Sequence, residues 1–269
     1  KTSRFHATIG GGAVIAAVAA ARLGVRSRVM SGLGRAALAR LRAERVAVSN
    51  LKRPAEPHAI TAALSTRADR SFVTFNGVND VLERRLLDAR ARLRARHVHF
   101  AFYPRACARW VPVLRDLRAA GVTTSWDFGW NEGLLDDPRF PDLLASIDYV
   151  LLNEVEAPLY ARQRSLEAAL AAWRAAPHHT VVKLGAAGSC WVSRERDVRV
   201  PAPRVRAVDT TGAGDAFNGG FLCGVLRGLA PRECLRLGNF VGARSTRRAG
   251  GLDGLPARAD VPASLRLPA

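Results

Sequence analysis

The sequence predicts an α/β fold built on a doubly wound, mostly parallel sheet. Segments of strand length and helix length alternate between residues 82 and 184, which is typical of a parallel sheet with helices on both faces. The chain has 269 residues, 48% of them hydrophobic, so it can bury a full core, as one large domain with an appendage or as two small ones. Here we expect strands at 97–102, 122–126, 147–152 and 180–184, and helices at 82–95, 107–120 and from 153 to 175.

The first third of the chain combines glycine turns with short strands. A strand from Arg4 to Ile9 should enter the turn Gly10-Gly11-Gly12, and an alanine-rich helix should follow until Gly24. The other expected elements are a strand at 27–31, a helix that ends near residue 44, and a β-hairpin whose strands are 58–65 and 71–75 and whose turn is 66–70.

Residues 208–221 place a glycine turn directly before a helix. Valines at 198, 200, 205 and 208 predict a β segment that leads into the turn. Gly212 and Gly214 lack side chains that would keep an anion from the unpaired N–H groups at the positive end of the helix dipole. Asp215, in the first helical turn, adds a carboxylate that can accept a proton. This pattern suits a kinase, although an ordinary glycine-rich helix start explains the short Gly-x-Gly-Asp core equally well.

Charge and composition argue against several other classes of protein. The formal net charge is +18, but 38 (41 − 3) of the 41 basic residues are arginines, and no run interleaves basic and aromatic residues. A nucleic-acid-binding surface is therefore not expected, whereas a polyanionic small substrate would still be attracted. The longest apolar run, 13–21, is too short to span a bilayer, and no signal peptide opens the sequence, so we expect a cytoplasmic protein without membrane contact. The four cysteines lack Cys-x-x-Cys spacing and are expected to be buried thiols.

The full string Asp-Thr-Thr-Gly-Ala-Gly-Asp-Ala-Phe, residues 209–217, resembles the second signature of the PfkB (ribokinase-like) family of carbohydrate kinases. The resemblance implies a ribokinase-like (Rossmann-like) core with a small β lid, and transfer of the ATP γ-phosphate to a sugar hydroxyl with Mg²⁺ and, in many members, K⁺. The core would comprise residues 11–56 and 78–269, and the lid residues 1–10 and 57–77. The family's first core strand and part of the lid would be absent, because the chain begins after them.

The resemblance also assigns the catalytic and metal positions. Asp215 would be the general base, and the N–H groups of the turn would stabilise the transferring phosphoryl group. The turn residues concerned are Gly212, Ala213 and Gly214. Asn153 and Glu156 match an Asn-x-x-Glu motif that organises Mg²⁺ and its waters, although a capping box at a helix start is an equally good explanation. Asp209 and Thr211 match positions that hold a monovalent cation in many members.

The nucleotide and the acceptor are placed by the same resemblance. The expected nucleotide-binding residues are Lys183, Gly185 and Gly188 of a strand-turn-strand segment, with Asn239 and Gly250 near adenine. The expected acceptor-binding residues are Gly10, Gly11, Asp127 and Asn76. Ordinary turns and hairpins explain the glycines and Asn76 as well. Asp127 follows one expected strand and Asn153 the next, so both lie at the sheet edge where such folds bind ligands.

These patterns favour an ATP-dependent sugar kinase with Asp215 as its base. A non-catalytic PfkB-like protein that binds a nucleotide or a sugar is the first alternative, because the family's sugar-contacting asparagine falls on Ile15 and the first strand is missing. The third reading is a dinucleotide-binding oxidoreductase, suggested by Gly-x-Gly-x-x-Ala at 32–37 and by Glu56 some twenty residues further on. Ribose, fructose, 2-keto-3-deoxygluconate, a sugar phosphate and a nucleoside all stay open as acceptors, with a free sugar favoured. The exposed lid edge makes a homodimer reasonable.

Overall fold

The computed structural model describes residues 7–65 and 70–265 of the chain. The strands are β1 Arg28–Ser31, β2 Ala47–Asn50, β3 Ile60–Ser65, β4 Arg70–Phe75, β5 His97–Ala101, β6 Thr123–Asp127, β7 Tyr149–Asn153, β8 His179–Lys183, β9 Ser189–Val192 and β10 Asp197–Val200. The α-helices are α1 Gly12–Arg22, α2 Arg35–Ala43, α3 Asn79–Asp88, α4 Cys107–Ala119, α5 Phe140–Ser146, α6 Glu156–Tyr160, α7 Leu166–Trp173, α8 Ala213–Leu226 and α9 Pro231–Ser245. Within the described residues, no helix combines the length and the apolar character needed to cross a bilayer.

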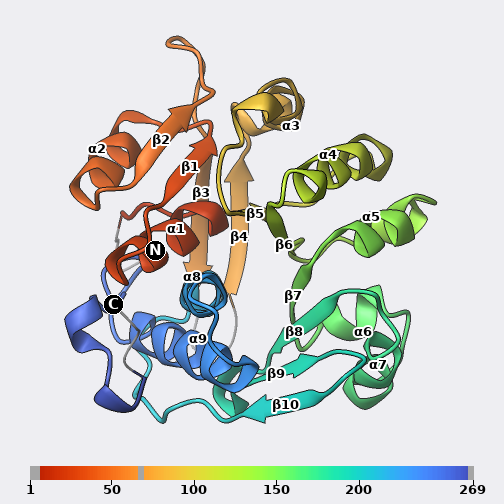
Figure 1. Ribbon diagram of the computed structural model, residues 1–269. Helices are drawn as coiled ribbons and strands as arrows, with labels where there is room; N and C mark the ends of the chain where they lie inside the picture. The colour runs from red at the N-terminus through yellow and green to blue at the C-terminus, as the bar shows by residue number, and fades with distance from the viewer. Residues whose placement is uncertain (1–6, 66–69, 266–269) are drawn as a thin grey trace.

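Six strands form the main sheet in the order β10-β9-β8-β7-β6-β5. Strands β5 to β8 pair in parallel, while β9 and β10 add an antiparallel edge (Figure 1). The run from β5 to β8 alternates with helices in the chain, because a parallel pair needs a long crossover connection. The α/β prediction with a mostly parallel sheet is thus confirmed.

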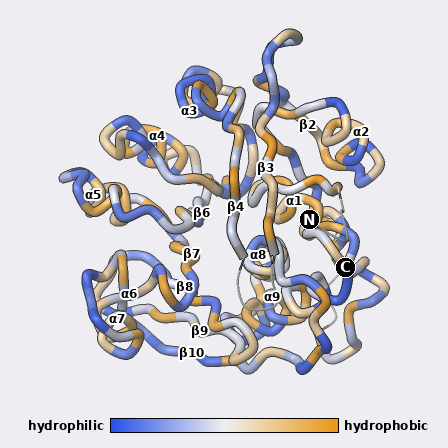
Figure 2. The backbone as a smooth tube through the Cα atoms, turned by 180° about the vertical axis from the view of Figure 1, so that it is seen from behind, coloured by the Kyte–Doolittle hydropathy of each residue, from blue (hydrophilic) through white to orange (hydrophobic). Residues whose placement is uncertain are grey.

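Two short ribbons accompany this sheet. Strands β1 and β2 pair in parallel as a separate two-stranded sheet, and β3 and β4 form the predicted antiparallel hairpin. The β3–β4 ribbon lies across one side of the molecule, behind α8 in Figure 1 and in front of it in Figure 2. A large groove is lined by residues of β3 on one side and by residues of α1 and β5 on another.

The core consists of apolar clusters on the two faces of the main sheet. One face buries a large aromatic cluster in which Trp126 of β6 stacks on Phe100 and Phe128 and meets Trp110 of α4 edge to face. The other face is covered by α8 and α9, with α1 packed against α8 (Figure 1). This packing holds the start of α8 at the carboxyl edge of the sheet, where ligands bind in open α/β folds.

The structure corrects three parts of the secondary-structure prediction. Strand β10 ends at Val200, and the prediction of a β segment as far as Val208 is wrong, since Val205 and Val208 are exposed in a loop. The helix expected from 153 to 175 is divided into α6 and α7, with Arg162 at a φ of 53° between them. Residues 4–6 of the expected strand Arg4–Ile9 and residues 66–69 of the expected turn 66–70 lie outside the described residues, and residues 7–9 form no strand.

Candidate active site

Helix α8 begins at a glycine turn whose geometry depends on the absence of side chains. Gly212 caps the helix with a φ of 72°, a left-handed conformation that L-residues with side chains rarely adopt. A Cβ on Gly212 would lie 2.6 Å from Cδ1 of Ile15, and a Cβ on Gly251 would lie 2.5 Å from the same atom. The N–H of Ala213 donates to the carbonyl of Thr210 at 3.2 Å. Ile15, at the position where the resemblance predicts a sugar-contacting asparagine, is buried and packs against this turn.

Asp215 lies in the first turn of α8 and faces the start of α1. A Cβ built on Gly12 would lie only 2.9 Å from Oδ1 of Asp215, so Gly12 leaves the room that the carboxylate occupies. Burial raises the pKa of Asp215 to about 7, and the negative charges of Asp127 and Glu156 add to the rise. The positive charge of Lys183 opposes this rise only in part. A carboxylate with this pKa is suited to accept a proton near neutral pH.

Asp127 and Lys183 form an ion pair at the carboxyl edge of the sheet. Asp127 ends β6 and Lys183 ends β8, on either side of β7, and Nζ of Lys183 lies 2.6 Å from Oδ2 of Asp127. Asn218 of α8 completes the group: its Nδ2 donates to the same Oδ2 at 2.7 Å, and its Oδ1 accepts from Nζ at 3.4 Å. Burial would raise the pKa of Asp127, but Lys183 outweighs it and holds that pKa below its usual value. Asn218 carried no recognised motif in the sequence, although its position three residues after Asp215 placed it on the same helix face.

Asn153 and Glu156 form a capping box around the start of α6. Oδ1 of Asn153 accepts from the N–H groups of Val155 and Glu156, and Oε2 of Glu156 accepts from the N–H of Asn153. Glu156 is 5% exposed, and burial, with Asp127 as a second cause, raises its pKa. The described residues contain no cluster of three or more His, Cys, Asp or Glu side chains that could hold a metal by themselves. These residues suit an ion that binds through its waters and substrate phosphates, as Mg²⁺ does.

Asp209 joins the glycine turn to the loop after α9. Its Oδ1 accepts from the N–H and hydroxyl of Thr211, and its Oδ2 accepts from the N–H of Gly250 at 2.9 Å. The sequence predicts a β segment directly before Asp209, but Asp209 lies in a loop. The structure thus brings together the two residues expected at a monovalent-cation site and one expected near adenine.

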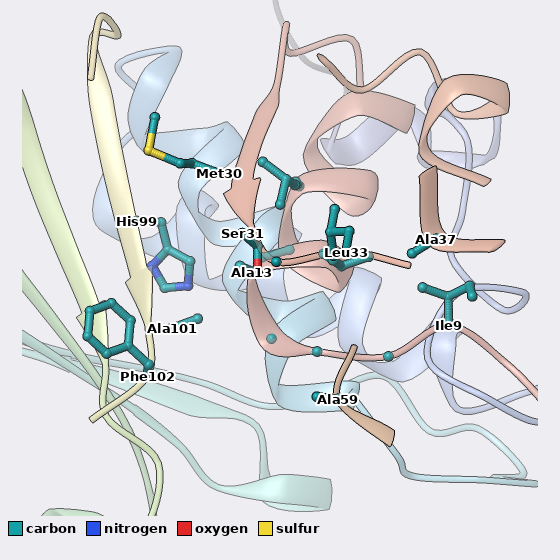
Figure 3. A pocket seen from close by; sticks show the side chains of 18 of the residues that line it. Ile9, Ala13, Met30, Ser31, Leu33, Ala37, Ala59, His99, Ala101 and Phe102 are labelled. Carbon is teal, nitrogen blue, oxygen red and sulfur yellow. The ribbon is translucent and has the colours of Figure 1, made fainter. Parts of the chain in front are cut away.

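The groove beside α1 has a volume of about 3500 Å³ and contains most of the residues expected to bind the acceptor. Gly10, Gly11 and Asn76 line it, together with Asp209 and Thr211. Figure 3 shows the groove between α1, β1 and β5, with Ala13, Ser31 and Ala101 around it. Asp127 is absent from the described lining, and its carboxylate instead contacts Lys183 and Asn218.

The residues expected to bind the nucleotide lie around the β8–β9 hairpin and α9. Gly188 ends the hairpin turn with a φ of 104°, and a Cβ there would lie 2.0 Å from the carbonyl oxygen of Val200. Gly185, in the same turn, is exposed with a φ of 55°. Asn239 is buried in α9, and its Nδ2 donates to the carbonyl of Val200 at 3.0 Å. Gly188 and Asn239 therefore both hold the end of β10 in place.

The structure gives Glu56 a role that needs no dinucleotide. Its carboxylate forms a bidentate ion pair with the guanidinium of Arg85 in α3, and it also accepts from the N–H of Arg53. Arg85 lowers the pKa of Glu56 to about 2, with the Arg53 N–H as a second cause. Gly34, in the Gly-x-Gly-x-x-Ala segment, faces the ring of His58, from which a Cβ would be 2.9 Å away.

Several similar proteins are named as kinases of sugars or sugar acids. An uncharacterised sugar kinase of Escherichia coli (strain K12) is 28% identical over 94% of this chain and 82% of its own length. One of Archaeoglobus fulgidus is 51% identical over 80 residues, which cover 29% of this chain and about a third (32%) of that protein. The 2-dehydro-3-deoxygluconokinase of Bacillus subtilis (strain 168) is 30% identical over 54% of this chain and 47% of its own length.

Solved kinases share the fold. A nucleoside kinase of Burkholderia thailandensis in complex with inosine superposes with a TM-score of 0.78 at 23% identity, covering 97% of this chain and 88% of that chain. An adenosine kinase of Sinorhizobium meliloti gives 0.75 at 26% identity, over 90% and 79%. A putative ribokinase II of Escherichia coli in complex with ATP and Mg²⁺ gives 0.69 at 23% identity, over 95% and 91%.

The family assignment follows from these matches together with the glycine turn and Asp215. Residues 1–258 match the model of the family described as "pfkB family carbohydrate kinase". The members of this family are phosphotransferases that act on a sugar hydroxyl. This chain belongs to the pfkB family of carbohydrate kinases.

Proposed function

We propose that this protein is an ATP-dependent sugar kinase in which Asp215 is the general base. The observation that carries the proposal is the position of Asp215 in the first turn of α8, beside the glycine turn and in contact with the start of α1. Its pKa of about 7 allows it to be ionised in part of the neutral range and to accept a proton from an alcohol as that alcohol attacks phosphorus.

The glycine turn would stabilise the transferring phosphoryl group. Gly212 and Gly214 would direct their N–H groups at its oxygens, and Ala213 would exchange its bond to Thr210 for a phosphate oxygen. Donors of this kind contribute about 2.7–4 kcal/mol each in other oxyanion holes. The dipole of α8 adds to the attraction of an anion at this end.

The nucleotide would lie along the carboxyl edge of the sheet, near Gly185 and Gly188 of the β8–β9 turn and near Gly250. Asn239 would position the segment after β10 that borders this site. Mg²⁺ bound to the phosphates would neutralise part of their negative charge. Asn153 and Glu156 would hold its waters, because Oε1 of Glu156 lies outside the capping bonds that engage Oε2. Asp209 and Thr211 would hold a monovalent cation such as K⁺.

The acceptor would enter the groove next to Gly10 and Gly11 and contact Asn76 at the end of the lid. A free sugar or sugar acid is favoured, since partial matches include a 2-dehydro-3-deoxygluconokinase and a ribokinase of Lactococcus lactis, each 30% identical. Nucleosides are the next class to test, because two of the similar folds belong to nucleoside and adenosine kinases.

A coupled ADP-release assay over a panel of sugars, sugar acids and nucleosides tests the proposal. We expect acceptor-dependent ADP release by the wild type and a fall in kcat of about a hundred- to ten-thousand-fold in Asp215→Asn, because the positioned base is lost. Asp142→Asn is the matched control, since Asp142 lies on the surface helix α5 and pairs with Arg139. Equal rates in wild type and Asp215→Asn would contradict the role of Asp215.

The second candidate is a protein that binds ATP or a sugar without turnover, and burial of Ile15 at the usual sugar-contacting position favours it. Isothermal titration calorimetry separates the two. Micromolar binding of ATP or a sugar without any ADP release would favour the binding protein.

We also propose that two copies associate through the lid. One face of the β3–β4 ribbon exposes Ile60, Leu64, Val73 and Phe75 at 55–63% of their surface. An isolated two-stranded ribbon with such a face is at best marginally stable in water, and a second copy would cover it.

As an enzyme that consumes ATP, the protein is expected to act in the cytoplasm.

A further inference from the structure

Three residues from three elements contact one another next to the first turn of α8. They are Asp127 of β6, Lys183 of β8 and Asn218 of α8. The side chains of Asp127 and Lys183 are 11% and 12% exposed, and Asn218 is completely buried. Because a buried charge is costly unless it is paired and hydrogen-bonded, this group is held in one arrangement.

The group lies close to both parts of the proposed catalytic apparatus. A Cβ built on Gly214 would be 3.4 Å from Nζ of Lys183, so the ammonium group lies beneath the glycine turn. Asn218 follows Asp215 by three residues, so the two side chains project from the same face of α8. The bonds of Asn218 to Asp127 and Lys183 therefore tie the helix turn that carries Asp215 to the ends of β6 and β8.

Two carboxylates and one cation act on Asp215, so negative charge is in excess around it. Asp127 and Glu156 are the carboxylates that act on it, Lys183 is the opposing cation, and His99 of β5 faces the Asp127–Lys183 pair from the next strand. Attraction by Asp127 and Glu156 outweighs burial and keeps the pKa of Lys183 above its usual value, so the ammonium stays charged. Burial lowers the pKa of His99 to about 4, so its ring is neutral near pH 7.

We propose that Asp127, Lys183 and Asn218 form a positioning network for Asp215. Asn218 fixes the ion pair against α8, and the pair fixes both the orientation of the helix turn and the charge that the base experiences. Asp127 and Lys183 then act on the reaction through Asp215 instead of contacting the acceptor and the nucleotide. This inference rests on the proposed kinase function.

Removing the positive charge of Lys183 and removing the negative charge of Asp127 should shift the pKa of Asp215 in opposite directions. Lys183→Met leaves two carboxylates unopposed, so Asp215 should hold its proton more tightly. Asp127→Asn keeps the shape of the side chain and removes one negative charge, so Asp215 should release its proton more readily. The double variant loses both charges and should return toward the wild type. A network that served stability alone would give no such opposite shifts.

The experiment records kcat and kcat/KM between pH 5 and pH 9 for these three variants, for Asn218→Leu and for the wild type. We expect the acidic limb of the pH–rate profile to move to higher pH by about one unit in Lys183→Met and to lower pH by a similar amount in Asp127→Asn. The KM for ATP should change less than threefold in both variants. Asn218→Leu should lower kcat about tenfold or more with little change in KM, because the base is less well placed. Unmoved limbs, or a tenfold rise in ATP KM for Lys183→Met without a shift, would overturn the proposal.

Two further measurements keep the test independent of turnover and of stability. Carboxyl-carbon NMR titration, with the Asp215 signal assigned by its loss in Asp215→Asn, follows the same opposite shifts in the folded protein. If the shifts occur while the wild type releases no ADP, the network is real and the proposed kinase function has failed. Arg22→Met breaks an ion pair with Glu44 at the far end of α1, and it should lower stability without moving the limb.

Discussion

At Asp215, burial and two neighbouring carboxylates favour the protonated acid, whereas Lys183 favours the carboxylate. The balance raises the pKa to about 7, far above the usual value for an aspartic acid. The same residue in an exposed helix start would be fully ionised near neutral pH, so its environment gives it the proton affinity that a general base needs.

The pH dependence of activity follows from this residue. A base must be deprotonated to act, so kcat/KM should rise between about pH 6 and pH 8, with its half-maximum near 7. Initial rates at subsaturating acceptor in buffers of constant ionic strength measure it. A rate that is flat from pH 5 to pH 8 would mean that a group with an ordinary carboxyl pKa is the base.

A second residue-scale effect concerns stability in acid. Burial lowers the pKa of His178 to about 4, and a backbone contact with Leu144 only partly opposes this effect. The unfolded chain binds the proton near pH 6.5, so stability is full above that pH and is lost as the pH falls toward 4. We expect a loss of about 1.4 kcal/mol in unfolding free energy per pH unit within this window.

Urea unfolding at pH 7, 6 and 5 measures the effect of His178. His178→Phe should fill the same position beside Trp173, whose ring centroid lies 5.6 Å away, and should flatten the pH dependence. Burial also lowers the pKa values of His97 and His99, to about 3 and about 4, so part of the slope should persist. An unchanged slope in the variant would show that His178 does not contribute.

At the scale of elements, α1 and α8 approach closely because α8 has glycine at the crossing. A Cβ on Gly219 would lie 2.4 Å from the carbonyl oxygen of Ala16 and 2.6 Å from Cβ of Ala19. Helix propensity alone would make Gly219→Ala stabilising by about 1 kcal/mol. We expect a loss of about 1–3 kcal/mol instead, because the two helices must move apart. Chemical denaturation gives the sign, and a gain in stability would contradict the close packing.

The same elements show how far sequence reasoning reaches. The glycine turn and Asp215 could be predicted because all of their parts lie within one short segment, 212–215, that carries its own dihedral and dipole signals. The pairing of Asp127 with Lys183 could not be predicted, because it depends on the strand order β8-β7-β6 and on side chains 56 residues apart in the chain. Strand β10 was extended too far because valine has high β propensity even where the chain leaves the sheet, as at Val208.

At the scale of the molecule, the lid determines the predicted association. Val73 is 63% exposed on the face of β4 that also carries Phe75. Val73→Lys should shift the protein from dimer to monomer in light scattering, because a charge would be buried in the shared face. Thr61→Lys, on the opposite face of the ribbon, is the matched control. A wild type that is monomeric at high micromolar concentration would rule out the association.

The separation of β1 and β2 from the six-stranded sheet has a consequence for how the molecule opens. Backbone amides in β7 and β8 lie in the middle of a ladder with strands on both sides, whereas β1 and β2 have only each other. Amide deuterium uptake should therefore be faster in the β1–β2 pair than in β7 and β8. The region around residues 28–50 would then exchange through a local fluctuation well below the energy of global unfolding.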